Sequence, residues 1–283
     1  MINVDIWKQR QRLHYKVRDF FLKQGLLEVD VPMLSEASGT DPQLDYFETL
    51  PPTRYLATSP EFFMKRLLAN GYGDIFCLTH AFRKGEFGER HNLEFNIAEW
   101  YRTGFSAEDL QQEILDLVNE ITGLNLHLKR TAWKQLFEKI DIEKLKAEHK
   151  GWALEEIEDY AMSSIIEPNL GKDCAEFIVD YPPQRAALAK IRKGVACRFE
   201  LYVNGIELCN GYEELIDAEE QKNRFLDDVE KRKKMEKPIP KIDEDFLAAM
   251  EKGLPECSGV ALGLDRLYML ALGKKDIREV LFI

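Results

Sequence analysis

The sequence lacks the features that mark membrane, secreted or disulfide-stapled proteins. Nothing in it approaches the roughly 18 consecutive apolar residues of a membrane-spanning helix. The N-terminus carries no apolar segment of the kind found in secretory signal peptides. Cysteines number five, and no two are closely spaced, which argues against a disulfide framework or a zinc site. We therefore expect a cytoplasmic protein with reduced cysteines and no membrane association.

The chain also has no overall excess of positive charge. The net charge is −11, which disfavours a protein whose main task is to coat nucleic acid. A local exception is the stretch 231–241, Lys-Arg-Lys-Lys-Met-Glu-Lys-Pro-Ile-Pro-Lys, with six positive charges against one negative. This stretch is either a solvated helix end and turn or a docking edge for an acidic macromolecule.

No internal repeat or low-complexity segment is visible. The composition, 45% apolar and 31% charged, is that of an ordinary globular protein, and 283 residues can bury a full core. We expect a single domain over residues 1–283. The charged residues at about 127–170 predict a helical insertion within it.

Apolar periodicity alternates between the helical and the extended pattern. A helix is expected over 5–24, before Gly25. Ser59-Pro60-Glu61 supplies an N-cap, a first-position proline and an acidic first turn for a helix that Gly71 ends. Strands are expected at 26–31, 55–58, 74–79, 94–100, 175–181, 196–203, 205–210 and 259–264, with further helices from the Ser106–Asp109 capping box and at 213–235 and 265–273. Many strands follow one another in hairpin-like pairs, which favours an antiparallel sheet flanked by helices, an α+β fold.

Cationic and aromatic side chains gather in the loop that precedes the strand at 94–100. Arg83, Arg90 and His91 could hold a polyphosphate, for which the planar fork of arginine is well suited. Phe95 offers a flat face on which a nucleotide base could stack. These residues indicate a nucleotide site.

Acidic residues follow in the same region and further along the chain. Glu99 and Tyr101 are two residues apart on an expected strand, so they point to the same face. Glu207, with Glu214 just beyond it, is a candidate carboxylate ligand for Mg²⁺. The glycine-rich segment 259–266 adds one more arginine at its end. Together with the nucleotide site, this pattern indicates an enzyme that binds a nucleotide beside a cationic substrate.

Taken in order, these segments resemble the three motifs of class II aminoacyl-tRNA synthetases. The segment 25–32 resembles motif 1, residues 82–95 resemble motif 2, and Gly-Val-Ala-Leu-Gly-Leu-Asp-Arg at 259–266 resembles motif 3. The resemblance implies the antiparallel catalytic domain of that family, ATP and Mg²⁺, and a homodimer formed through motif 1. The ATP-binding residues that it implies are Arg83, Lys84, Gly85, His91, Asn92, Phe95, Glu207, Leu208, Gly263 and Arg266, with Mg²⁺ at Glu207 and Glu214.

Within this class, the segments 58–61, 99–101 and 205–215 resemble lysyl-tRNA synthetases. In that family, acids at the positions of Glu61, Glu99 and Glu214 surround the two amino groups of lysine, which agrees with the need of a buried ammonium for carboxylates. The substrate-binding residues that follow from the resemblance are Ser59, Pro60, Glu61, Glu99, Tyr101, Asn210, Glu214 and Ala261.

Two departures from lysyl-tRNA synthetases stand out. The motif 1 segment begins almost at Met1, which leaves no room for the domain that reads the anticodon, so we expect no anticodon recognition of tRNA. Ala261 stands where those synthetases usually have glycine. Both features resemble the (R)-β-lysine ligases, paralogues that transfer β-lysine from an adenylate to one lysine of elongation factor P. The methyl group of Ala261 would reshape a pocket wall and separate β-lysine from lysine.

The motif 2 loop differs from the family in one respect. The family usually has Asn and Glu after Phe-Arg, whereas Lys84 and Gly85 follow here and the first acid is Glu86. Either the loop shifts by one residue or a backbone group contacts the base. We expect Arg83 to stabilise charge on the α-phosphate and Arg266 to hold the γ-phosphate, with Mg²⁺ near Glu207.

Three functions remain open at this point. The first is a ligase that modifies a lysine of elongation factor P. The second is an enzyme that activates α-lysine or uses another acceptor such as tRNA. The third is a non-catalytic module that binds an amino acid, although such a module should have lost the phosphate-binding arginines that this chain keeps.

Overall fold

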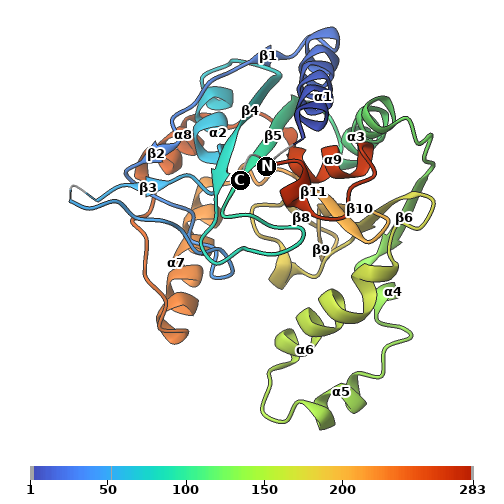
Figure 1. Ribbon diagram of the computed structural model, residues 1–283. Helices are drawn as coiled ribbons and strands as arrows, with labels where there is room; N and C mark the ends of the chain where they lie inside the picture. Colours follow the sequence, from blue (N-terminus) through green and yellow to red (C-terminus); the bar gives the residue numbers. More distant parts are fainter. Residues whose placement is uncertain (1–2, 52, 282–283) are drawn as a thin grey trace.

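An eight-stranded sheet forms the centre of the molecule, and helices pack against it (Figure 1). The computed structural model describes residues 3–51 and 53–281. In spatial order the strands are β1 (Leu27–Glu28), β4 (Ile75–Phe82), β5 (Glu94–Thr103), β12 (Cys257–Gly263), β11 (Ile206–Glu213), β10 (Arg198–Val203), β7 (Ala175–Val179) and β6 (Leu128–Ala132). The six central strands are antiparallel, which confirms the predicted α+β fold. The edge strands β1 and β6 each pair in parallel with their neighbour, so the sheet as a whole is mixed.

One face of the sheet is apolar and carries the main core. Phe76, Trp100, Val260 and Phe199 lie on neighbouring strands and all point to this face. Three helices cover it, α1 (Val4–Lys23), α3 (Ala107–Thr122) and α9 (Leu264–Ala271), and Figure 1 shows them together on one side. Burial of this surface away from water supplies the main driving force for the fold.

The opposite face of the same strands is polar, because side chains alternate along a strand. Two rows of paired residues cross five strands on this face. One row is Cys77, Glu99, Ala261, Asn210 and Glu200, and the other is Ile75, Tyr101, Gly259, Tyr212 and Arg198. The polar residues predicted on separate strands therefore lie side by side.

A β-bulge on β11 interrupts this alternation. Leu201 pairs with Cys209, whereas the next residue, Tyr202, pairs with Glu207, so that Leu208 is an extra residue on β11. Leu208 and Cys209 both pack into the apolar core. As a result Glu207 emerges on the polar face together with Asn210, although the two are three positions apart and would point to opposite faces of a regular strand. Bulges of this kind often occur beside active sites, where they redirect a side chain.

The remaining elements surround the polar face or extend from the sheet edge. They are β2 (Leu34–Ser35), β3 (Tyr55–Leu56), α2 (Glu61–Ala69), α4 (Trp133–Leu136), α5 (Ile142–Glu148), α6 (Leu154–Ala161), η1 (Met162–Ile166), η2 (Glu167–Asn169), η3 (Pro183–Arg185), β8 (Ile191–Arg192), β9 (Val195–Ala196), α7 (Ala218–Lys234), α8 (Glu244–Gly253) and η4 (Ile277–Glu279). Figure 1 shows α5 and α6 extending away from the β6 edge, while α7 projects from the other side of the molecule.

Several predicted boundaries need correction. The strand expected at 26–31 is only Leu27–Glu28. Helix α2 begins at Glu61 with Pro60 as its N-cap residue, and the hydroxyl of Ser59 accepts a hydrogen bond from the Glu61 amide at 3.2 Å. Helix α7 begins at Ala218 rather than 213, because β11 continues to Glu213. The range 127–170 is not wholly helical, since its first part forms the edge strand β6.

Helices α4, α5 and α6 do lie within the predicted insertion. That residues 1–283 form a single domain stays a prediction. Within the described ranges, no helix has both the length and the apolar character needed to cross a lipid bilayer.

Candidate active site

A cavity of about 1430 Å³ lies over the polar face of the sheet. The loop at 35–44 and the helices α2, α6 and α7 contribute its walls. The predicted site residues that line it are Ser59, Glu61, Arg83, His91, Asn92, Phe95, Glu99, Tyr101, Glu207, Leu208, Asn210, Glu214, Ala261, Gly263 and Arg266.

Pro60, Lys84 and Gly85 do not belong to the lining of this cavity. Pro60 is the N-cap residue of α2. Lys84 forms an isolated β-bridge with Asp45, and its amide donates a hydrogen bond to the Asp45 carbonyl at 2.9 Å. Gly85 has a φ of +88°, a conformation that favours glycine, so it shapes the turn of the motif 2 loop. Glu86, which follows, does line the cavity and lies 3.7 Å from Arg83.

Arginines converge at one end of the cavity. Arg266 donates hydrogen bonds to the main-chain oxygens of Glu207 at 2.8 Å and Arg90 at 3.1 Å. The guanidinium carbon of Arg83 lies 5.2 Å from the centre of the Phe95 ring. Arg90 is fixed by a hydrogen bond from its guanidinium to the Gly205 carbonyl. This end of the cavity is thus cationic and has an aromatic face, as binding of a nucleotide requires.

His91 completes the cationic end without adding charge. Its Nε2 atom lies 2.6 Å from a terminal nitrogen of Arg266. Burial, and then the charge of Arg266, lower the pKa of His91. The neutral ring can therefore accept a hydrogen bond from Arg266 near pH 7 and hold that guanidinium in place.

Two carboxylates stand beside the arginines. Glu207 lies 3.2 Å from Arg266, and Glu200 projects from the neighbouring strand β10 into the same cavity. Burial raises the pKa of Glu207. The charge of Arg266 lowers this pKa in part, whereas the charge of Glu200 raises it. Mg²⁺ typically takes carboxylates alongside phosphate oxygens, so Glu207 and Glu200 are the residues that could hold the ion, although Glu200 also pairs with Arg198 and accepts from the Tyr202 hydroxyl at 2.9 Å. Glu200 was not among the predicted site residues, because its segment indicated only a strand.

The second predicted ligand of Mg²⁺, Glu214, lies elsewhere. Six residues of β11 lie between Glu207 and Glu214, so roughly 20 Å of extended chain separates the two. Glu207 and Glu214 therefore cannot bind one ion together. The carboxylate of Glu214 contacts a lysine instead.

That lysine, Lys65 of α2, lies at the anionic end of the cavity. Its Nζ atom is 2.6 Å from Glu61 and 2.6 Å from Glu214. Burial opposes its charge, but the carboxylates of Glu214 and Glu61 outweigh that effect and raise the pKa of Lys65. Sequence reasoning missed this residue as a part of the site. The available signal was a lysine inside the apolar run of α2.

Among the described residues, Glu99 forms no ion pair with a cationic side chain. It accepts hydrogen bonds from the Ser59 hydroxyl at 2.5 Å and the Tyr101 hydroxyl at 2.7 Å. Burial, and then the charge of Glu61, raise its pKa to about 8. Burial likewise raises the pKa of Glu214 to about 7, with Lys65 acting in the opposite direction. A cationic ligand would oppose these shifts, because it favours the ionised forms of Glu99 and Glu214.

Small residues of β12 form the floor between the two ends. A Cβ atom added to Gly259 would overlap the Tyr101 ring and lie 2.5 Å from a Glu214 oxygen, so this position requires glycine. Ala261 lies between Glu99 on β5 and Asn210 on β11, directly paired with both. Its methyl group is therefore part of the surface that any ligand of Glu99 would touch.

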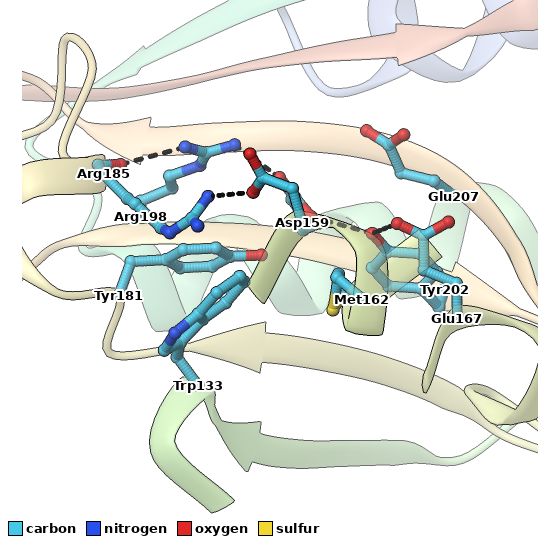
Figure 2. Close-up of a pocket in the computed structure, with 10 residues that line it drawn as sticks. Trp133, Asp159, Met162, Glu167, Tyr181, Arg185, Arg198, Tyr202 and Glu207 are labelled. Atoms are coloured by element: carbon cyan, nitrogen blue, oxygen red, sulfur yellow. Dashed lines mark hydrogen bonds and ion pairs between the residues drawn. The ribbon is translucent and has the colours of Figure 1, made fainter. Parts of the chain in front are cut away.

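A smaller cavity of about 250 Å³ adjoins the main one beside Glu207 (Figure 2). Arg198 pairs with Glu200 and donates to the main-chain oxygen of Arg185 at 2.9 Å. The Arg185 side chain reaches Asp159 of α6 at 2.6 Å, as Figure 2 shows. These contacts attach the inserted helix α6 to the strands that carry Glu200 and Glu207.

Comparison with known proteins agrees with this geometry. The family described as "tRNA synthetases class II (D, K and N)" matches residues 3–283. A protein of Haemophilus influenzae named "Elongation factor P--(R)-beta-lysine ligase" is 40% identical, over 96% of this chain and 93% of the relative. Proteins with the same name from Pasteurella multocida and Klebsiella pneumoniae are 41% and 40% identical, over 92% and 93% of their own lengths. This chain belongs to the elongation factor P–(R)-β-lysine ligase family, within the class II tRNA synthetases.

Membership of this ligase family confirms the resemblance found in the sequence. The motif 1 segment contains the edge strand β1, motif 2 runs from the end of β4 to the start of β5, and motif 3 spans β12 and the start of α9. The roles of individual residues in this ligase site stay predictions.

Proposed function

We propose that this protein activates (R)-β-lysine with ATP and transfers the β-lysyl group to the ε-amine of one lysine in elongation factor P. Its relatives bear the name of this ligase. The observation that carries the proposal is the separation of charge in the cavity. Arg83, Arg90 and Arg266 gather at one end, and Glu61, Glu99 and Glu214 at the other.

The anionic end matches an amino acid with two ammonium groups. Three carboxylates and the single ammonium of Lys65 leave two negative charges when all are ionised. Lysine and β-lysine each carry two ammonium groups, so either would complete the balance. Burial makes this balance important, because an unpaired charge in such a site is costly.

In the first step, the carboxylate of the amino acid attacks the α-phosphorus of ATP. The new bond between carboxylate oxygen and phosphorus forms as the bond to the β-phosphate bridge breaks, and pyrophosphate leaves. Arg83 stabilises the charge on the α-phosphate, Phe95 stacks on adenine, and Arg266 holds the γ-phosphate. Mg²⁺ held by Glu207 and Glu200 would neutralise phosphate charge. Positioning and electrostatics supply most of the acceleration, so no covalent nucleophile of the enzyme is required.

In the second step, the uncharged ε-amine of the acceptor lysine attacks the carbonyl carbon of the adenylate. An amide bond forms, the bond to the phosphate oxygen breaks, AMP leaves, and the amine loses a proton to solvent. The acceptor must therefore enter the same cavity from outside, between the helices that border it.

The test is mass spectrometry of elongation factor P after incubation with this protein, ATP, Mg²⁺ and either (R)-β-lysine or α-lysine. We expect one lysyl unit on a single lysine, with more product from the β isomer. Pyrophosphate exchange without any modified elongation factor P would refute the acceptor. A higher yield with α-lysine would refute the amino acid preference, and efficient charging of tRNA would point to a synthetase instead.

We also propose a homodimer formed through the segment 25–32. Leu22 and Leu27 are half exposed near the edge strand β1, where a second copy could cover them. The exchange Leu27→Glu should convert a dimer to a monomer in sedimentation velocity. A wild-type protein that sediments as a monomer at micromolar concentration would contradict this assignment.

The cysteines indicate the cellular compartment of the enzyme. All five cysteines are free thiols, and four of them are buried. Unpaired cysteines are typical of a reducing compartment, and we therefore propose that the enzyme acts in the cytoplasm.

A further inference from the structure

The basic stretch 231–241 contains cations of two kinds. Arg232 is fully buried and donates hydrogen bonds to the main-chain oxygens of Thr40 at 3.0 Å, Asp41 at 2.9 Å and Pro238 at 3.0 Å. Lys237 donates to the Pro42 oxygen at 2.8 Å. These two side chains hold the loop at 40–45 against the end of α7, and their role is structural.

Other lysines of the stretch are exposed, and only some of them face the main cavity. Lys231, Lys234 and Met235 line the main cavity, whereas Lys233 does not and contacts Glu230 instead. Lys234 and Met235 follow Lys231 by three and four residues, so all three lie on one face at the end of the helix. We call this set, Lys231, Lys234 and Met235, the lysine edge. Figure 1 shows that the end of α7 that carries it projects beyond the neighbouring loops.

The wall contributed by α6 has the opposite charge. Glu155, Glu156 and Asp159 also line the cavity, and the first two are exposed. Asp159 is already paired with Arg185. On the α7 side, Asp228 also lines the cavity, 3.9 Å from Lys231, but Arg224 and the two lysines leave that lining net positive. A macromolecule that reaches into the cavity therefore meets net positive charge on the α7 side and negative charge on the α6 side.

We propose that the lysine edge docks an acidic surface of the acceptor protein next to the lysine that enters the cavity. This inference rests on the proposed function, because it concerns the second half-reaction. The acidic wall of α6 then faces the cationic acceptor lysine and its surroundings, which fixes the orientation of the bound protein. Complementary charge of this kind raises the rate of encounter and sets the register of two proteins.

The chemistry of the edge favours a protein over RNA as its partner. Met235 is 48% exposed between the two lysines and suits a contact with protein side chains better than one with phosphates. The carboxylates of α6 across the cavity would repel a polyphosphate backbone. The net charge of −11 on the whole chain also disfavours binding of RNA.

The test compares two double variants with the same change of charge on the same helix. Lys231→Glu with Lys234→Glu reverses the edge, and Lys222→Glu with Lys233→Glu reverses two exposed lysines that do not line the cavity. Each protein is assayed for β-lysine-dependent pyrophosphate exchange and for the kcat and KM of elongation factor P modification, at low and high salt.

We expect the edge variant to raise the KM for elongation factor P about tenfold at low salt, with kcat and pyrophosphate exchange unchanged. High salt should reduce the difference, because exposed charges are screened. The control variant should match the wild type. Equal KM values for the two double variants would overturn the proposal, as would tRNA that inhibits the wild type but not the edge variant. A wild type that exchanges pyrophosphate but never modifies elongation factor P would overturn the proposed function and this inference with it.

Discussion

Lys65 Nζ lies 2.6 Å from Glu214 Oε2, and each of these side chains is only 1% exposed. The pair joins α2 to the end of β11 directly under the anionic end of the cavity. Lys65 also contacts Glu61 at 2.6 Å, so one ammonium of the protein fixes two of the three carboxylates expected to bind the substrate. The protein thus arranges the site before any amino acid arrives.

Replacement of Lys65 by methionine should destabilise the protein by about 3–5 kcal/mol, because it leaves buried carboxylates without their cation. Urea denaturation measures this loss. Lys23→Met is the control, since the pair of Lys23 with Asp19 is exposed and should contribute about 0.5 kcal/mol or less. A Lys65→Met loss no larger than that of the control would contradict the structural role of this pair.

Glu99 should make both stability and substrate binding depend on pH. Its folded pKa of about 8 exceeds the usual 4.5, because of burial and then the charge of Glu61. The folded state therefore holds this proton more tightly than the unfolded chain, and its contribution to stability falls as pH rises from about 4.5 to about 8. A substrate ammonium favours the ionised form, so the KM for β-lysine should fall as pH rises towards about 8, by up to about tenfold per pH unit.

The matched variant for this pH effect is Glu99→Gln, which keeps the shape of the side chain. We expect a weaker affinity for β-lysine and the loss of the slope in KM between about pH 6 and about pH 8. A variant that retains the slope would assign the titration to another group of the site.

Arg83 should act in the first half-reaction. Arg83→Ala is expected to lower β-lysine-dependent pyrophosphate exchange about 10²–10³-fold, the usual effect of removing a donor that stabilises charge in a transition state. Arg83→Lys should recover little, since lysine lacks the planar fork. Arg54→Ala is the control, because Arg54 pairs with Glu36 outside the cavity. Exchange retained by Arg83→Ala would exclude the proposed role.

Ala261 should determine which isomer of lysine is preferred. Its methyl group lies between Glu99 and Asn210, and Ala261→Gly opens space there. We expect the ratio of kcat/KM for β-lysine over α-lysine, measured by pyrophosphate exchange, to fall about 10- to 100-fold. The glycine should cost about 1 kcal/mol of stability at most. An unchanged ratio would remove Ala261 from the specificity determinants.

Arg232 should stabilise the loop that borders the cavity. Arg232→Met leaves the buried carbonyl of Thr40 and the partly buried carbonyls of Asp41 and Leu44 without donors and should cost about 3 kcal/mol. Hydrogen exchange should also become faster in this loop than elsewhere. Lys234→Met, at an exposed position of the same helix, should change neither quantity. Equal protection of the loop in both variants would show that Arg232 does not hold it.

The sequence alone was sufficient to predict which residues lie together where they belong to one loop and the strand that follows it. Arg83, Phe95, Glu99 and Tyr101 are close in sequence, and strand spacing alone assigns the last two to one face. Cross-strand neighbours such as Ala261 could be included only through the resemblance to known motifs. The central antiparallel strands were predicted from their hairpin-like spacing.

Other features depend on contacts between distant parts of the chain. A lysine in a helix usually faces solvent, and Lys65 is buried only because Glu214 lies opposite it. Glu200 appeared as an ordinary strand residue, and its place beside Glu207 becomes visible only when β10 and β11 pair. Strand β6 was taken for part of a helical insertion, because its charged residues lie on an edge that the sheet leaves half exposed.

The bulge at Leu208 keeps the two halves of strand β11 out of phase with each other. Removal of this one residue would restore a regular strand and preserve the pairing with β10. Glu207 would stay opposite Tyr202 and on the polar face, because Asn210, Cys209 and Glu207 would then alternate regularly. A regular strand that kept Leu208 would instead turn Glu207 towards the apolar core while Asn210 stayed in the cavity, and this would disconnect the nucleotide half of the cavity from the amino acid half. The irregular pairing of this strand is therefore as much a determinant of the chemistry as the identity of any side chain on it.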